Sequence, residues 1–109
     1  MIFIRASGIN ELGPGGKMKV VLKNKEILLA NLDGTYYAIE NTCPHMGGSL
    51  SDGKIEGNTI VCPKHGAIFD ITNGHAVKNG KLLFITAKVS NIKSYPVRIE
   101  GSDIMVGLE

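Results

Sequence analysis

The chain has no tryptophan, few other aromatic residues and only two cysteines among its 109 residues. Proteins that bind single-stranded nucleic acid by stacking need aromatic platforms on a basic surface, and aromatic residues make up only 6% here. The excess of positive charge is also small, because 12 basic residues face 10 acidic ones and are dispersed along the chain. We therefore expect no nucleic-acid partner.

Long hydrophobic runs are missing as well. No apolar stretch approaches the roughly 18 residues of a membrane-spanning helix, so we expect no membrane partner. The opening residues, MIFIRASGIN, lack the basic start and the long apolar stretch of a secretory signal. We therefore expect a cytoplasmic protein whose cysteines stay reduced, because disulfides are rare in that compartment.

What the chain does contain is a series of short β-favouring segments separated by turn residues. The dipeptide Asp33-Gly34 is typical of a two-residue hairpin, whereas only 8–12 indicates a helical turn, with Ser7 as its cap. Fourteen glycines in this pattern favour an all-β antiparallel sandwich or barrel, formed by a single domain over 1–109. The predicted strands are 18–24, 26–32, 35–40, 58–62, 67–71, 82–88, 94–100 and 104–108.

A loop-forming stretch, 41–57, interrupts this strand-rich chain, and loops of that length in compact domains are usually functional. It contains Cys43 and His45, spaced as Cys-x-His. After a spacer of 16 residues come Cys62 and His65, spaced as Cys-x-x-His. Glycine follows both pairs, which lets the backbone approach an inorganic group closely. The two loops therefore predict a metal site.

The identity of the metal follows from how the ligand types are paired. Two thiolates and two imidazoles can bind a tetrahedral zinc ion. Zinc fingers, however, usually place cysteine with cysteine in one arm and histidine with histidine in the other, whereas each arm here has one of each. This pairing favours a binuclear cluster in which each loop gives its cysteine to one iron and its histidine to the other. A zinc-stabilised interaction domain and a plain disulfide remain as alternatives.

At this point the sequence resembles the Rieske family, through TCPHMGG at 42–48 and CPKHGAIFD at 62–70. The resemblance spans nearly the whole chain. It implies an antiparallel β-sandwich with a smaller cluster-binding subdomain of two loops, at about 41–74. It also implies one [2Fe–2S] cluster per chain, with both histidines at the protein tip as the exit route of the electron. The implied ligands are Cys43 and Cys62 on one iron, and His45 and His65 on the other.

The chain lacks features of the Rieske proteins of cytochrome bc complexes, which it also resembles. Those proteins carry an additional cysteine in each loop, at positions that match Gly48 and Lys64 here. They also place hydroxyl donors at positions that match Ala67 and Phe69. Hydrogen bonds to the cluster sulfurs stabilise the more negative reduced state, so their absence lowers the potential. The chain is therefore similar to low-potential ferredoxins that feed aromatic-ring-hydroxylating oxygenases, although its stretch 78–91 is longer than in many family members.

The resemblance implies an electron-transfer protein rather than an enzyme. Such a monomer takes one electron from a flavin-dependent reductase and passes it to a terminal oxygenase or another redox enzyme, docking transiently at the cluster tip, 44–48 and 63–66. The alternative is a small Rieske subunit of a larger oxidoreductase complex, similar to those of nitrite reductase or arsenite oxidase. The former commonly lose the ligands and the latter carry the extra disulfide, so neither matches this chain well.

Overall fold

The computed structural model describes residues 1–44, 47–82 and 85–109, which form mostly antiparallel strands. The predicted all-β fold is confirmed. The helices of the described chain are 3-10 turns at Ile9–Glu11 and Leu50–Asp52, and none of the described helices has the length and apolarity to cross a membrane. The strands are β1 Ile2–Gly8, β2 Lys17–Leu22, β3 Lys25–Leu32, β4 Thr35–Glu40, β5 Lys54–Glu56, β6 Thr59–Val61, β7 Ile68–Asp70, β8 Ala76–Lys78, β9 Gly80–Leu82, β10 Ile85–Ala87, β11 Ser94–Tyr95, β12 Val97–Glu100 and β13 Asp103–Leu108.

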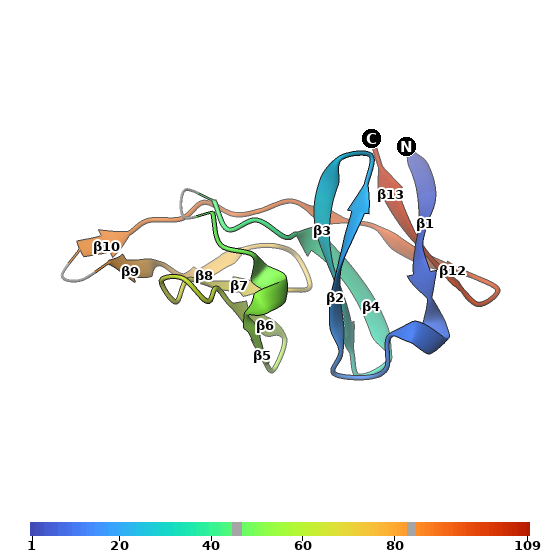
Figure 1. Ribbon diagram of the computed structural model, residues 1–109, viewed down its shortest axis with the longest axis horizontal. Coiled ribbons are helices and arrows are strands. Elements are labelled where there is room, and N and C mark those ends of the chain that lie inside the picture. The colour runs from blue at the N-terminus through green and yellow to red at the C-terminus, as the bar shows by residue number, and fades with distance from the viewer. Residues whose placement is uncertain (45–46, 83–84) are drawn as a thin grey trace.

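Two sheets form a sandwich that carries both chain termini (Figure 1). One sheet has the strand order β1-β13-β12 and the other has the order β11-β4-β3-β2. A third sheet, of order β5-β6-β7-β8, lies beside the sandwich, and the β9–β10 hairpin forms the opposite end of the molecule. The molecule is elongated, with extents of 49 × 27 × 18 Å. The cysteine-bearing loops therefore lie in the half that is remote from the termini.

Strand β3 explains how the two halves are joined. Its side chains alternate between two hydrophobic cores: Ile27 and Leu29 point into the sandwich, and Leu28 and Ala30 point toward the third sheet. All four are fully buried, which accounts for the continuous apolar run in this segment. The second core also contains Cys43 and Cys62, Leu50, Ile60, Ala67, Phe69 and Ile71.

Two hairpin turns set the register around β3. Asp33 and Gly34 both have positive φ, 57° and 95°, so the predicted two-residue turn between β3 and β4 is confirmed. Lys23 and Asn24 also have positive φ, 49° and 65°, and they form the turn between β2 and β3. The predicted strand at 18–24 therefore ends too late, because its last two residues belong to the turn.

Two further strand predictions need correction. The segment 82–88, expected as one buried strand, contributes instead to the two short strands of the β9–β10 hairpin. The segment 94–100 is split at Pro96, which has no N–H to donate: β11 pairs with β4, whereas β12 pairs with β13. The sequence analysis also missed β1, which pairs with β13 along most of its length.

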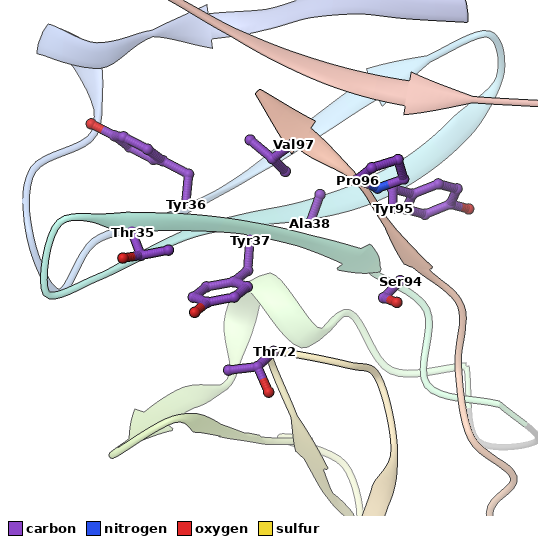
Figure 2. Close-up of a pocket in the computed structure, with 9 residues that line it drawn as sticks. All are labelled: Thr35, Tyr36, Tyr37, Ala38, Thr72, Ser94, Tyr95, Pro96 and Val97. Atoms are coloured by element: carbon purple, nitrogen blue, oxygen red, sulfur yellow. The ribbon is translucent and has the colours of Figure 1, made fainter. Parts of the chain in front are cut away.

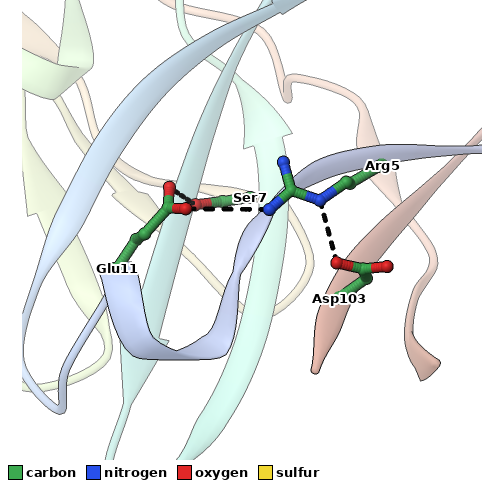
Figure 3. A network of polar contacts seen from close by, with 4 residues as sticks. All are labelled: Arg5, Ser7, Glu11 and Asp103. Carbon is green, nitrogen blue, oxygen red and sulfur yellow. Dashed lines mark hydrogen bonds and ion pairs between the residues drawn. The ribbon is translucent and has the colours of Figure 1, made fainter. Parts of the chain in front are cut away.

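A polar network fixes β1 to the 3-10 turn and to β13 (Figure 3). The Arg5 Nε–H donates to Asp103 Oδ1 at 2.8 Å, and Arg5 Nη2 lies 3.6 Å from Glu11 Oε1. The Ser7 hydroxyl donates to the other Glu11 oxygen at 2.9 Å. The prediction that Ser7 caps the helical turn is therefore wrong, because its side chain binds a carboxylate instead of a backbone N–H.

Candidate metal centre

The first cysteine loop, residues 43–48, is closed by two backbone hydrogen bonds. The Cys43 N–H donates to the Gly48 carbonyl at 2.8 Å, and the Gly47 N–H donates back to the Cys43 carbonyl at 3.0 Å. Gly47 has a φ of 69°, a conformation that glycine adopts without strain. We call this pair of hydrogen bonds the frame, and it holds Cys43, three residues after the end of β4, as its first residue.

The second cysteine loop, residues 62–67, repeats this frame. The Cys62 N–H donates to the Ala67 carbonyl at 2.7 Å, and the Gly66 N–H donates to the Cys62 carbonyl at 3.1 Å. Gly66 has a φ of 78°, close to that of its counterpart in the first loop. The frame connects β6 to β7, so each cysteine is the first residue of the same kind of turn.

The two cysteines meet between the loops. Both are free thiols, with 0% of Cys43 and 1% of Cys62 exposed. Burial, a hydrogen bond with Cys62 and the charge of Cys62 together raise the pKa of the Cys43 thiol to about 12. Two thiolates are therefore disfavoured at this point unless a cation compensates their charge, and a metal ion supplies such compensation.

Gly48 provides the space in which the loops approach each other. A Cβ atom added to Gly48 would lie 2.8 Å from Cys62 Sγ and 3.5 Å from the Cβ of Lys64. The positions that match the extra cysteines of the cytochrome bc proteins, Gly48 and Lys64, thus face each other at a Cβ separation that suits a disulfide. In this chain the space between the two loops is bounded by Gly48 and by the aliphatic part of the Lys64 side chain.

Asn41 holds the base of the first loop, and the sequence analysis did not identify it. Its side chain is fully buried, donates to the Ser49 hydroxyl at 2.8 Å and accepts the Ser51 N–H at 2.8 Å. Its backbone accepts from Leu50 at 2.7 Å and donates to the Glu26 carbonyl at 3.0 Å. Its side-chain partners lie eight and ten residues further along the chain, so no local pattern pointed to this role.

Lys17 provides a second support from the sandwich. Its Nζ donates to the Ser51 carbonyl at 2.5 Å, and its side chain is half-buried. Its neighbours along the same hairpin, Lys19, Lys23 and Lys25, are exposed as a solvated face. The first loop is therefore attached to the sandwich by both a buried amide and a lysine.

Of the two candidate histidine ligands, the structure describes His65 but not His45. His65 is half-buried in the second loop, and its carbonyl accepts the Lys81 N–H at 2.8 Å. His45 and its neighbour Met46 lie outside the described residues. Within the ranges that the structure describes, no three His, Cys, Asp or Glu side chains gather closely enough to hold a metal ion. The structure thus brings together the two cysteines, and the role of both histidines stays a prediction.

Of two cavities in the molecule, one reaches the cysteine site and the other does not. A cavity of about 510 Å³ lies where β11 stops pairing with β4, and Cys43 and Cys62 are not among its lining residues (Figure 2). A cavity of about 400 Å³ reaches Cys62 from the side of β5. The first is lined by Thr35, Tyr36, Tyr37, Ala38, Thr72, Ser94, Tyr95, Pro96 and Val97. It belongs to the open edge of the sandwich and not to the cysteine site.

Comparisons with known proteins agree with this geometry. The family described as "Rieske [2Fe-2S] domain" matches residues 3–105. The ferredoxin component of the naphthalene 1,2-dioxygenase system of Pseudomonas aeruginosa is 36% identical, over 97% of this chain and 95% of its own length. The 3-phenylpropionate/cinnamic acid dioxygenase ferredoxin subunit of Shigella boydii is 36% identical over 87% and 84%. The solved ferredoxin of Sphingomonas yanoikuyae B1 has a TM-score of 0.82 and 28% identity, covering 99% of this chain and 100% of its own.

Proposed function

Because this chain belongs to the Rieske [2Fe–2S] domain family, we propose that it is the ferredoxin of an oxygenase system. In this role it accepts one electron from a flavin-dependent reductase and delivers it to a terminal oxygenase, and it acts as an electron carrier rather than an enzyme. The match to ferredoxin components over nearly their full length supports this role. It also favours a separate carrier over a subunit of a nitrite reductase-like or arsenite oxidase-like complex.

The proposed ligands are Cys43 and Cys62 for one iron, and His45 and His65 for the other. The observation that carries this proposal is the pair of matching turns, which hold two buried thiols side by side. Soft sulfur donors, of which Cys43 has a raised pKa, fit a cluster whose positive irons displace the thiol protons. When bound, the [2Fe–2S] cluster supplies reversible one-electron chemistry.

The cysteines are packed on the inside and have exposed neighbours in their own loops. They share a buried core with Leu50, Ile60 and Phe69. Gly47, Pro63 and Lys64 are exposed within the proposed docking tip of 44–48 and 63–66, of which 45–46 lie outside the described residues. This arrangement supports transient docking of a monomer at the tip, with the cluster-binding part at about 41–74 of a single domain over 1–109. We also propose a cytoplasmic location, where cysteines stay reduced.

The decisive experiment compares the wild-type protein with Cys43→Ser and Cys62→Ser. The wild type should be brown, with visible absorption and a Rieske-type electron paramagnetic resonance signal after reduction. Each serine variant should lose both. A normal Rieske signal in Cys43→Ser would contradict the ligand assignment, and a colourless wild type that retains zinc would contradict the function. His45→Cys and His65→Cys should keep a cluster but shift its signal toward that of a four-cysteine ferredoxin.

A further inference from the structure

The charges of this chain are distributed unevenly along its length. Residues 57–93 carry five lysines and a single acidic residue, Asp70. Residues 94–109, at the other end of the molecule, carry one arginine against three acidic residues. The segment 57–93, which includes the second cysteine loop, is therefore cationic, although the net charge of the whole chain is only +2.

Four of these lysines form what we call the cationic arm: Lys64, Lys78, Lys81 and Lys88. All four are exposed, and no ion pair joins any of them to a carboxylate in the part of the chain that the structure describes. The arginines of the sandwich differ, because Arg5 pairs with Glu11 and Asp103, and Arg98 pairs with Glu100. Among the described residues, Lys19, Lys23 and Lys25 of the sandwich likewise have no ion pair, so what distinguishes the arm lysines is their place beside the second cysteine loop.

The arm is structurally continuous with the cysteine site. The Lys81 N–H, on β9, donates to the carbonyl of His65 in the second cysteine loop at 2.8 Å. Lys78, at the end of β8, pairs with Ile68 at the start of β7, directly after that loop. The hairpin that carries Lys81 therefore extends from the second loop at the end of the molecule farthest from the termini (Figure 1).

Building on the proposed electron-carrier function, we propose that the cationic arm is an electrostatic docking surface, which selects redox partner proteins that present an acidic surface. Unpaired charges of one sign raise the encounter rate with a partner of opposite sign and disfavour partners of like sign. The bond between Lys81 and His65 keeps this surface next to the cysteine site. An acidic partner steered to the arm is thereby brought to the loop from which the electron leaves.

The test uses flavodoxin as an acidic protein probe and two variants with equal loss of charge. One variant replaces Lys78, Lys81 and Lys88 with glutamine. The control replaces Lys19, Lys23 and Lys25, which are exposed on the sandwich, with glutamine. Stopped-flow absorbance measures the rate at which reduced flavodoxin reduces each cluster-loaded protein across a range of salt concentrations, and the dissociation constant with oxidised flavodoxin is measured alongside. Midpoint potentials verify that the driving force is unchanged.

In the wild type, the rate and the affinity should both fall as salt rises. The arm variant should react about tenfold more slowly at low salt, bind flavodoxin more weakly and show a flatter salt dependence. The sandwich variant should stay within about twofold of the wild type. Equal losses in the two variants, or an unchanged arm variant, would overturn the proposal. If instead the wild type showed no cluster spectrum, the proposed function itself would fail, and the binding measurement would still report on the arm.

Discussion

The two cysteine loops share one backbone frame but are supported in different ways. The first is fixed to the sandwich by polar contacts, through the buried amide of Asn41 and the ammonium group of Lys17. The second is flanked by the short strands β6 and β7 and rests on apolar packing. At the position equivalent to Asn41, two residues before the cysteine, it has the fully buried Ile60.

This difference shows that the frame alone does not fix the site. Turns closed by the same two backbone hydrogen bonds present the two cysteines, but their relative position depends on two independent supports, one polar and one hydrophobic. Hydrogen bonds impose direction on a loop, whereas apolar packing fixes its depth in the core. Substitutions at equivalent positions of the two loops should therefore have unequal effects.

The largest effect is expected at the last position of the frame. Gly48→Ala places a Cβ 2.8 Å from Cys62 Sγ, so the sulfur or the loop must shift and the cluster content should fall. Ala67→Gly, at the equivalent position, removes only a methyl group and should reduce the unfolding free energy by about 1 kcal/mol. Visible absorbance after reconstitution measures the first effect, and urea unfolding measures the second. Equal cluster content in both variants would show that the loops do not approach each other closely.

The next effect separates the two supports. Asn41→Ala removes the partners of the Ser49 hydroxyl and the Ser51 N–H, and should reduce the unfolding free energy by about 2 kcal/mol. Ile60→Ala leaves a cavity and should reduce it by about 2–5 kcal/mol.

The rate at which a chelator removes the cluster should rank these two variants in the opposite order, with faster release from Asn41→Ala than from Ile60→Ala. Asn41→Ala loosens the loop itself, whereas Ile60→Ala weakens the fold as a whole. Release rates that simply follow the unfolding free energy would show that Asn41 has no specific role in positioning the first loop.

A smaller effect concerns the potential and involves only the second loop. Ala67 and Phe69 are fully buried and carry no hydroxyl, so Ala67→Ser and Phe69→Tyr together should raise the midpoint potential. The shift should be on the order of 100 mV, within the span of Rieske centres. Protein-film voltammetry measures it. An unchanged potential together with lower stability would mean that the new hydroxyls are buried without a partner.

The smallest effect is a pH dependence on the side of the first loop. Burial, and then the charge of Glu40, raise the pKa of Tyr95, which pairs with β4 just before that loop. Because the folded pKa exceeds the unfolded value of 10.0, this contribution to stability is complete below pH 10.0 and is lost as the pH rises further. Urea midpoints from pH 9 to 11 should fall less steeply in Tyr95→Phe. An identical slope would exclude Tyr95 as the source.

The sequence predicted those features that depend on neighbouring residues. The Asp33-Gly34 turn and the strand 35–40 follow from turn chemistry and β-favouring side chains, and the structure confirms both. The ligand motif depends on spacing along the chain, and it identified the two cysteines that meet in the structure. The family resemblance carried by that motif is borne out by the family match.

Features that depend on distant residues escaped prediction. Strand β1 lacks a regular alternation of apolar and polar residues. It is defined instead by its pairing with β13, about a hundred residues away. The role of Asn41 requires Ser49, Ser51 and Glu26 to meet, which no local pattern encodes. The apolar run in 82–88 resembles a core strand, because composition alone does not distinguish a buried strand from a hairpin.

Strand β3 has a consequence for how the protein is assembled. Consecutive residues on this strand belong to different cores, so a shift of one residue in its pairing would exchange Ile27 with Leu28 and disrupt both cores at once. The correct register is therefore enforced from two sides, and the bond from Asn41, just after β4, to the Glu26 carbonyl near the start of β3 requires it. The first cysteine loop can take its observed shape only on a correctly paired β3, so an error of register in the sandwich is also an error at the cysteine site.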